Sequence, residues 1–372
     1  MLSYDLYKDC LSTETMRNIW SEAETIASWL RVEQALARAQ ADHELIPQEA
    51  ADRIGEIVPA QIDAEELKQE MMLVGRPIVG LVRQLKQLVG DHAGRVHFRA
   101  TTQDIMDTAL ALQMKSGLSD VTTSVLAIIA LVEHSIEKYG SAEIIGRTNG
   151  QYAVPVQLSL KLTLWREELA RRLEAIEQAA DRGLNVQIGG PVGDLRGYEA
   201  SKGMHIKQAV AKHFGLGVIT PHWQNTRDGV FDVTNALGSL CATLCKIAHN
   251  INLLASSDIA EASERHTNGR GASSAMAHKR NQRASEFAEA LARLGRQRTE
   301  QMGELTLHQH ERSGGVWIGE WLLVPEIFLL TAGALHWTTL MFSGLQFHTD
   351  QMQDRIREFQ SSKLPANATP GH

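Results

Sequence analysis

The chain has 372 residues and a formal net charge of −7 at pH 7. This charge excludes the broad basic surface that is typical of nucleic-acid-binding proteins. Three cysteines, Cys10, Cys241 and Cys245, are too few for a disulfide framework, and residues 1–9 carry charges in place of an apolar signal segment. We therefore expect a cytoplasmic protein with a large buried core.

Residues 1–96 contain several helices of medium length. Ser21 and Glu24 fit a capping box ahead of an apolar helical face. Pro47 begins a further helix, and the run Gly75-Arg76-Pro77 separates the next two. These signals predict a small N-terminal helical domain over residues 1–96.

From Thr101 onward the predicted helices are much longer. They cover about 101–139, 154–182, 228–264, 283–305 and 319–342, with Pro155 tolerated in the first turn of the second. Five long helices in succession predict a bundle over residues 97–345, without a sheet. The apolar stretch 321–342 is interpreted as a buried bundle helix, because Pro325, Glu326 and His336 interrupt it. Residues 346–372 form a short C-terminal segment, expected to fray from 360 onward.

The most informative stretch is residues 269–281, GRGASSAMAHKRN. No Asp or Glu occurs from 266 to 285, whereas Arg270, Lys279, Arg280 and Arg283 all do. Such a local excess of positive charge can hold a carboxylate or a phosphate, and glycine lets the backbone approach a ligand closely. A solvated, charged linker is the alternative interpretation.

Residues 272–281 resemble the signature G-S-S-x-M-P-x-K-x-N of the fumarase/aspartase superfamily, with Ala272 and Ala277 replacing Gly and Pro. Three more segments resemble blocks of the same superfamily: 97–109, 146–155 and 310–321. The last closely resembles the H-E-R-S-x-G-x-W-x-x-E-W run of the 3-carboxy-cis,cis-muconate cycloisomerase subgroup. Segments 74–77 and 223–228 favour the same subgroup.

The resemblance implies an all-α fold with a small N-terminal domain and a long five-helix bundle. In the family, four bundles form a homotetramer with a twenty-helix core, and three subunits contribute to each active site. A third, small C-terminal helical domain is also usual, and this chain stops near the point where that domain would begin.

The resemblance also implies site residues. Ser273 falls on the catalytic serine, and the gap in acidic residues around it suits a stabilised alkoxide. Glu286 falls on a glutamate that is paired with a catalytic histidine in the family. Asn149 occupies the position of that histidine and cannot exchange a proton near neutral pH, so we expect Glu286 to orient Lys279 or an arginine instead. The expected substrate-binding residues are Thr101, Thr102, Gln103, Thr148, Asn149, Gln151, Ser274, Lys279, Asn281 and Arg312.

The sequence leaves open which residue donates the proton, and it offers simpler interpretations of two other groups of residues. Tyr152, His97 and His310 are all candidates for the proton donor. Thr101 and Thr102 also fit an ordinary helix N-cap. His308 and His310 lack a third ligand at suitable spacing, so we expect no metal, and the family chemistry needs no cofactor.

The family reaction removes a proton next to a carboxylate and expels a group from the neighbouring carbon. Cycloisomerases run the comparable step as an intramolecular addition, and both pass through an aci-carboxylate that cations and hydrogen-bond donors stabilise. The sequence therefore predicts a cycloisomerase or lyase acting on a small di- or tricarboxylate, without nucleic-acid or membrane partners. The alternatives are a C–N lyase that releases fumarate, a catalytically silent structural paralogue, and a nucleotide or nucleic-acid binder, which no aromatic residues in the basic stretch support.

Overall fold

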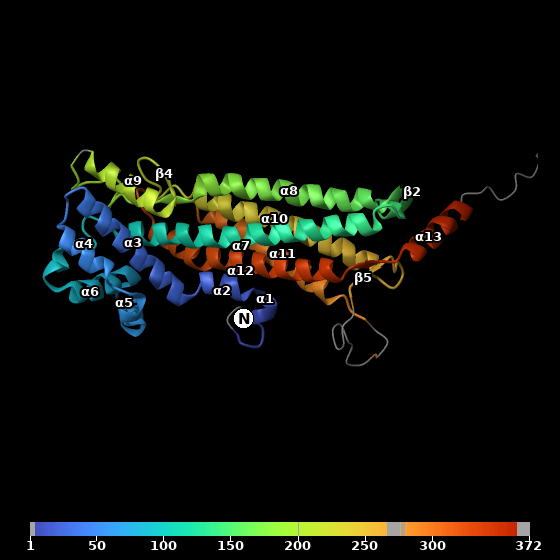
Figure 1. Ribbon diagram of the computed structural model, residues 1–372, viewed down its shortest axis with the longest axis horizontal. Helices are drawn as coiled ribbons and strands as arrows, with labels where there is room; N and C mark the ends of the chain where they lie inside the picture. Colours follow the sequence, from blue (N-terminus) through green and yellow to red (C-terminus); the bar gives the residue numbers. More distant parts are fainter. Residues whose placement is uncertain (1–3, 200, 266–275, 277–279, 363–372) are drawn as a thin grey trace, which may run out of the picture.

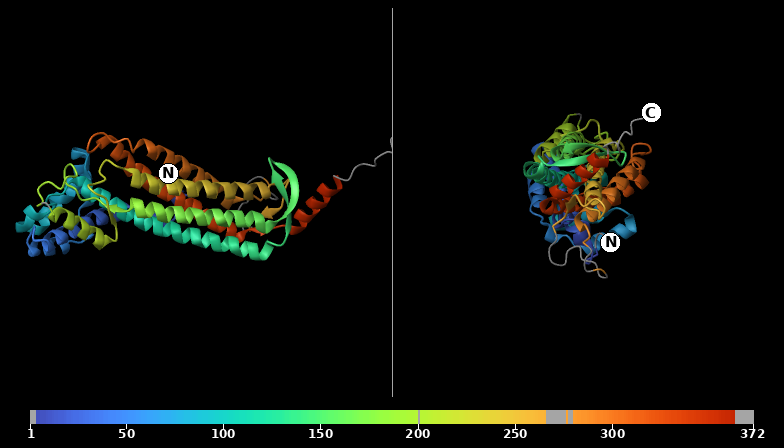
Figure 2. Two further views of the ribbon diagram at one scale, coloured as in Figure 1. Left: turned by 90° about the horizontal axis from the view of Figure 1, so that it is seen from above. Right: turned by 90° about the vertical axis from the view of Figure 1, so that its right-hand side faces the viewer.

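The computed structural model describes residues 4–199, 201–265, 276 and 280–362. Its centre is an elongated bundle of five long helices that lie side by side (Figures 1 and 2). They are α7 (Thr102–Tyr139), α8 (Leu158–Gly183), α10 (Asp228–Leu254), α11 (Arg283–Glu304) and α12 (Gly314–Gly344). Val121, Leu240 and Phe328 are fully buried in their common core. The predicted all-α five-helix bundle is confirmed.

A second hydrophobic core lies at one end of the bundle, among short helices. Helices α1 (Lys8–Leu11) and α2 (Glu14–Ile19) are not part of it, because they pack on α7 and α12 of the bundle. The helices that form the second core are α3 (Glu22–Asp42), α4 (Gln48–Gly55), α5 (Ala64–Val74), α6 (Pro77–Val89) and α9 (Lys202–Phe214), with 3-10 turns η1 (Pro59–Gln61) and η2 (Gly90–Arg95). Because α9 packs on α3, this core also includes Ile206 and Val210, far outside residues 1–96.

The predicted helix boundaries in this region are confirmed by their caps. The Ser21 hydroxyl accepts a hydrogen bond from the Glu24 backbone N–H at 3.1 Å, at the start of α3. Pro47 is the N-cap of α4. Gly75 has φ +72°, the left-handed conformation that ends α5, and Pro77 then begins α6.

The second long helix begins at Leu158, so the prediction that it starts at Val154 was wrong. Residues Gln151–Gln157 form strand β2, which pairs antiparallel with β1 (Glu143–Thr148) and places Pro155 opposite Ile145. Asn149 and Gly150 form the two-residue turn, with φ of +52° and +77°. Asn-Gly suits a turn in which both central residues need positive φ, and this preference decides the hairpin.

Four very short strands complete the described part of the chain. β3 (Asn185–Val186) pairs in parallel with β4 (Gly217–Val218), and β5 (Ala262–Ser263) pairs antiparallel with β6 (Gln346–Phe347). The predicted third long helix, α10, ends at Leu254 instead of residue 264, and β5 occupies part of the stretch that was expected to be helical. After β6, helix α13 (Thr349–Ser362) packs against β1, so the segment expected to fray is helical to Ser362.

Helices α7, α10 and α12 are long and apolar enough to cross a membrane, judged by length and composition only. All three lie in the bundle, where they pack against one another and the neighbouring helices. Val324, Phe328 and Thr331 of α12 are fully buried there, as expected for a bundle helix.

Candidate active site

Two of the expected substrate-binding residues meet at the N-terminal end of α7. Thr101 is the N-cap of this helix, and its hydroxyl accepts a 2.8 Å hydrogen bond from Nη1 of Arg312, 211 residues away. Thr102 lines a neighbouring cavity of about 540 Å³ together with His97 and Lys86. The first and last motif blocks of the sequence thus lie at the same end of the bundle.

Gln103 was expected to bind substrate, but the structure turns it inward. Its side chain is fully buried, and Nε2 donates to Asp107 Oδ2 at 2.9 Å and to the Gln224 carbonyl at 2.8 Å. Successive helical residues point about 100° apart, so Gln103 faces the core when its two predecessors face outward. From this position its amide nitrogen supports Asp107, and its expected role in binding substrate stays a prediction.

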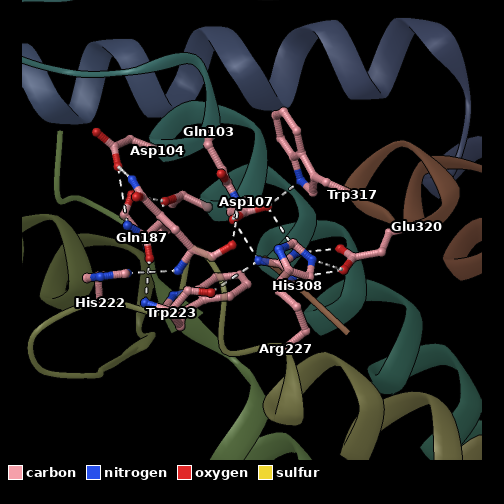
Figure 3. A network of polar contacts seen from close by, with 12 residues as sticks. Gln103, Asp104, Asp107, Gln187, His222, Trp223, Arg227, His308, Trp317 and Glu320 are labelled. Atoms are coloured by element: carbon pink, nitrogen blue, oxygen red, sulfur yellow. Dashed lines mark hydrogen bonds and ion pairs between the residues drawn. The ribbon is translucent and has the colours of Figure 1, made fainter. Parts of the chain in front are cut away.

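The buried polar core behind Thr101 is organised around Arg227, the N-cap of α10 (Figure 3). Nη1 and Nη2 of Arg227 donate to Asp107 at 2.7 and 3.1 Å, and Nε donates to Glu320 at 2.9 Å. A second bond joins Nη2 to Glu320. We name Asp107, Arg227 and Glu320 the arginine cluster, and all three side chains are at most 1% exposed.

Aromatic and imidazole groups surround the arginine cluster (Figure 3). Trp317 Nε1 donates to Asp107 at 3.1 Å, and the Arg227 guanidinium lies 4.6 Å from the Trp223 ring centroid. His308 Nε2 lies 3.8 Å from a Glu320 oxygen. Burial raises the pKa of the Glu320 carboxyl, but Arg227 and His308 more than offset it, so the net pKa is lowered.

Asp104 holds the loop after β3 against the start of α7. Its carboxylate accepts hydrogen bonds from the backbone N–H groups of Gly189, Gly190 and Thr101 at 2.9, 2.9 and 3.0 Å, and from Gln187 Nε2 at 3.3 Å. Burial raises the pKa of Asp104 to about 6, and these hydrogen bonds counteract the rise.

Two of the three proton-donor candidates, His97 and His310, lie at the Thr101 end of the bundle, whereas Tyr152 lies on the hairpin at the other end. His97 Nδ1 lies 2.6 Å from buried Glu33; burial lowers the His97 pKa, but Glu33 outweighs it and leaves the pKa raised. The Tyr152 hydroxyl, on the hairpin, accepts a 3.0 Å hydrogen bond from Arg355 Nη1. His310 is exposed, and its carbonyl accepts a 2.5 Å hydrogen bond from Asn225.

The other expected residues that the structure describes lie at the opposite end of the bundle. Thr148, Asn149 and Gln151 are exposed on the β1–β2 hairpin, with Asn149 in its turn. Asn281 and Glu286 line a cavity of about 860 Å³. Ser273, Ser274 and Lys279 lie outside the described residues.

Two ion pairs organise this end. Glu286 accepts a 2.6 Å bond from Arg283, three residues earlier on the same helix, and its expected role of orienting Lys279 or an arginine stays a prediction. Arg147 binds buried Glu261 with both terminal nitrogens, at 2.8 and 2.9 Å, and so fixes the hairpin to the start of β5. The block at 146–155 and the described residues Arg280 and Asn281 of the block at 272–281 therefore lie at the same end of the bundle.

The 38 residues of α7 separate the two ends. At 1.5 Å per residue this helix is about 57 Å long, so a small molecule bound at Thr101 cannot touch Thr148 of the same chain. Among the described residues, no group of three or more His, Cys, Asp or Glu side chains is arranged to hold a metal ion.

A protein-family model described as lyase matches residues 5–293 of the chain. The chain belongs to the fumarase/aspartase superfamily. It is 33% identical to 3-carboxy-cis,cis-muconate cycloisomerase of Acinetobacter baylyi, over 94% of this chain and 79% of the relative. It is 32% identical to trans-aconitate decarboxylase 1 of Mycosarcoma maydis, over 94% of this chain and 71% of the relative.

The structural comparison agrees with the sequence comparisons. The crystal structure of β-carboxy-cis,cis-muconate cycloisomerase from Acinetobacter calcoaceticus superposes with a TM-score of 0.88 at 31% identity, covering 95% of this chain and 81% of that one. The sequence-based assignment to this superfamily, and to enzymes of the lyase type, is confirmed.

The sequence analysis assigned no role to the arginine cluster. A usable signal was present, since Glu320 lies between apolar residues such as Trp317, Leu323 and Val324 on α12, and Asp107 lies among apolar residues of α7 such as Ile105 and Ala111. Charged side chains are rarely fully buried unless they are paired. An acidic residue at an apolar position on each of two bundle helices therefore predicts a buried cation between them, a prediction the sequence analysis did not make.

Proposed function

We propose that the chain is a cycloisomerase or lyase that acts on a small di- or tricarboxylate through an aci-carboxylate intermediate, most like 3-carboxy-cis,cis-muconate cycloisomerase. The observation that carries this proposal is the Arg312–Thr101 pair, which sets a guanidinium beside a hydroxyl at the exposed N-terminus of α7. The guanidinium fork matches a carboxylate geometrically, and a helix N-terminus favours bound anions. The two named relatives act on a carboxymuconate and an aconitate, which supports a polycarboxylate substrate.

We further propose that the active form is a homotetramer whose sites are shared between three subunits. The Thr101 end and the hairpin end of one chain are about one helix length apart, roughly 57 Å. One small substrate can contact both motif blocks only if another subunit supplies the second. Exposed apolar residues on the bundle, Leu126, Leu160 and Leu164, support such packing.

In the proposed lyase direction, Ser273 removes the proton from the carbon next to a substrate carboxylate. The electron pair of that C–H bond moves into the carboxylate; it then returns to form the carbon–carbon double bond as the group on the next carbon leaves with its own bonding pair. Lys279 and Asn281 stabilise the added negative charge. In the cycloisomerase direction a substrate carboxylate adds to the double bond, and a proton returns to the neighbouring carbon.

Asn149 is not the proton donor in this scheme. Its amide does not titrate near neutral pH, and its positive φ serves the hairpin turn. The leaving group therefore takes its proton from another residue, and the candidates remain Tyr152, His97 and His310.

Two alternatives keep specific support. A C–N lyase that releases fumarate would use the same carboxylate-binding residues. A catalytically silent paralogue is favoured by Asn149, Ala272 and Ala277, which replace the usual family residues. We also propose a cytoplasmic location, which the three unpaired cysteines support.

The test is an ultraviolet absorbance screen of the purified protein with carboxymuconates, trans-aconitate and N-succinyl amines. We expect turnover of at least one compound, and its loss in Ser273→Ala. Arg53→Ala, an exposed change on α4, serves as the control and should leave turnover unchanged. A folded protein that turns over none of these compounds would favour the silent paralogue.

A further inference from the structure

The arginine cluster lies on the same two helices as the proposed carboxylate-binding pair. Helix α7 carries Thr101 at its N-cap and Asp107 in its second turn. Arg312 lies just before α12, and Glu320 lies in the second turn of that helix. Arg227 bonds both acidic residues and so joins the beginnings of α7, α10 and α12 at one point (Figure 3).

The Arg312–Thr101 hydrogen bond cannot fix its own geometry. It is exposed to solvent, where long side chains exchange partners and a single contact contributes little. The arginine cluster is buried and bidentate on the Asp107 side, and such charge-assisted bonds are short and strongly directional. Its bonds therefore set how far apart the ends of α7 and α12 lie.

Stability alone does not account for the arginine cluster. Apolar residues of similar volume often stabilise a core as well as a buried ion pair does, because charges lose their hydration on burial. Here the Arg227 guanidinium donates hydrogen bonds to two carboxylates. His308 Nε2 lies 3.8 Å from the second carboxylate, that of Glu320. The directional bonds of the guanidinium fork fix the position of one helix relative to the other. An apolar core would not fix this position.

We propose that Asp107, Arg227 and Glu320 are positioning residues that hold Thr101 and Arg312 at the spacing needed to bind a substrate carboxylate. This proposal rests on the proposed function, in which Arg312 binds that carboxylate. The cluster does not touch the substrate, so its effect must pass through Arg312.

A double-mutant cycle tests this dependence. Glu320→Gln keeps the side-chain shape, and we expect KM to rise about tenfold, the factor for one weakened charge-assisted hydrogen bond. The turnover number should stay within about threefold, because ground-state binding is what is lost. In an Arg312→Ala background, Glu320→Gln should change KM less than about twofold. If the two effects multiply, the proposal is wrong.

The control is Thr331→Val, which removes a buried hydroxyl bonded to the Ile327 carbonyl on the same helix, far from the cluster. Its effect on KM, if any, should multiply with that of Arg312→Ala. If Glu320→Gln fails to fold, Asp107→Asn replaces it in the cycle. Circular dichroism and the oligomeric state are compared for every variant.

A second measurement needs no turnover. Phenylglyoxal modifies exposed guanidinium groups, and peptide mass spectrometry gives the rate at Arg312. We expect faster modification of Arg312 in Glu320→Gln than in the wild type or Thr331→Val. Equal rates would overturn the positioning role. If the wild type turns over no substrate, the proposed function fails, and this rate alone decides the positioning role.

Discussion

Replacing Arg227 with Met would remove the guanidinium that donates hydrogen bonds to both carboxylates of the arginine cluster. Met fills similar space, so the main change is electrostatic: Asp107 and Glu320 remain fully buried without their shared donor. Breaking a buried ion pair from one side lowers the free energy of unfolding by about 3–5 kcal/mol. For a chain of this size, that corresponds to a fall in Tm on the order of 10 °C.

The stability that Arg227→Met loses should depend on pH, and the direction follows from the two carboxylates. Without Arg227, burial and mutual repulsion raise the folded-state pKa of Asp107 and Glu320 above their unfolded values. A group with a raised pKa loses its stabilising contribution as pH rises through that pKa. The variant should therefore melt closer to the wild type at pH 5 than at pH 8.

Thermal unfolding followed by circular dichroism at pH 5, 6.5 and 8 measures both effects. The triple variant Asp107→Asn, Arg227→Met, Glu320→Gln removes all three charges together and should recover much of the lost Tm. A single Arg227→Met variant within about 1 kcal/mol of the wild type, or a loss that is equal at pH 5 and 8, would refute the electrostatic argument.

Three further predictions concern other parts of the molecule. Gly150→Ala places a side chain at φ +77° and should lower the free energy of unfolding by about 1 kcal/mol in chemical denaturation, whereas Gly94→Ala, at open space and ordinary φ, should not. The raised pKa of His97 implies stabilisation that is complete below its unfolded pKa of about 6.5 and lost as pH rises through the folded pKa. His97→Gln should therefore lower Tm more at pH 6 than at pH 9. Mixing inactive Thr148→Ala and Ser273→Ala proteins under subunit exchange should restore part of the activity; if mass spectrometry confirms exchange and none returns, the shared-site model is wrong.

The bundle could be predicted because its signals are local. Capping residues such as Ser21, breakers such as Gly75, and apolar spacing along α7 each act within one or two turns of helix. Those rules hold wherever the segment lies in the fold. They located the five long helices, with the largest boundary errors where a short strand replaced an expected helical turn.

The hairpin was missed because one residue carried two interpretations. Asn149 aligns with a catalytic histidine of the family, and it is also the first residue of an Asn-Gly turn. The turn was the stronger signal, since Asn-Gly between two extended runs favours a tight hairpin. Helix α13 was missed for a different reason: its docking depends on β1 and on the β5–β6 pair, which no local pattern reveals.

The arginine cluster shows what a motif block cannot reveal without three-dimensional structure. Consecutive helical residues point about 100° apart, so Thr101, Thr102 and Gln103 cannot all face one ligand. The block that contains them also contains Asp107, one turn beyond Gln103 on the inner face, where the two side chains meet at 2.9 Å.

The last motif block, residues 310–321, also contains both outward-facing and inward-facing side chains. Arg312 points outward to Thr101, whereas Trp317 and Glu320 point inward to Asp107 and Arg227. Each block thus has outer positions suited to a ligand and inner positions that fix the helix. Because the inner positions of the two blocks bond through one guanidinium, a change at Glu320 should be felt at Arg312 without any contact with the substrate. The two blocks, about 200 residues apart in sequence, therefore act as one unit.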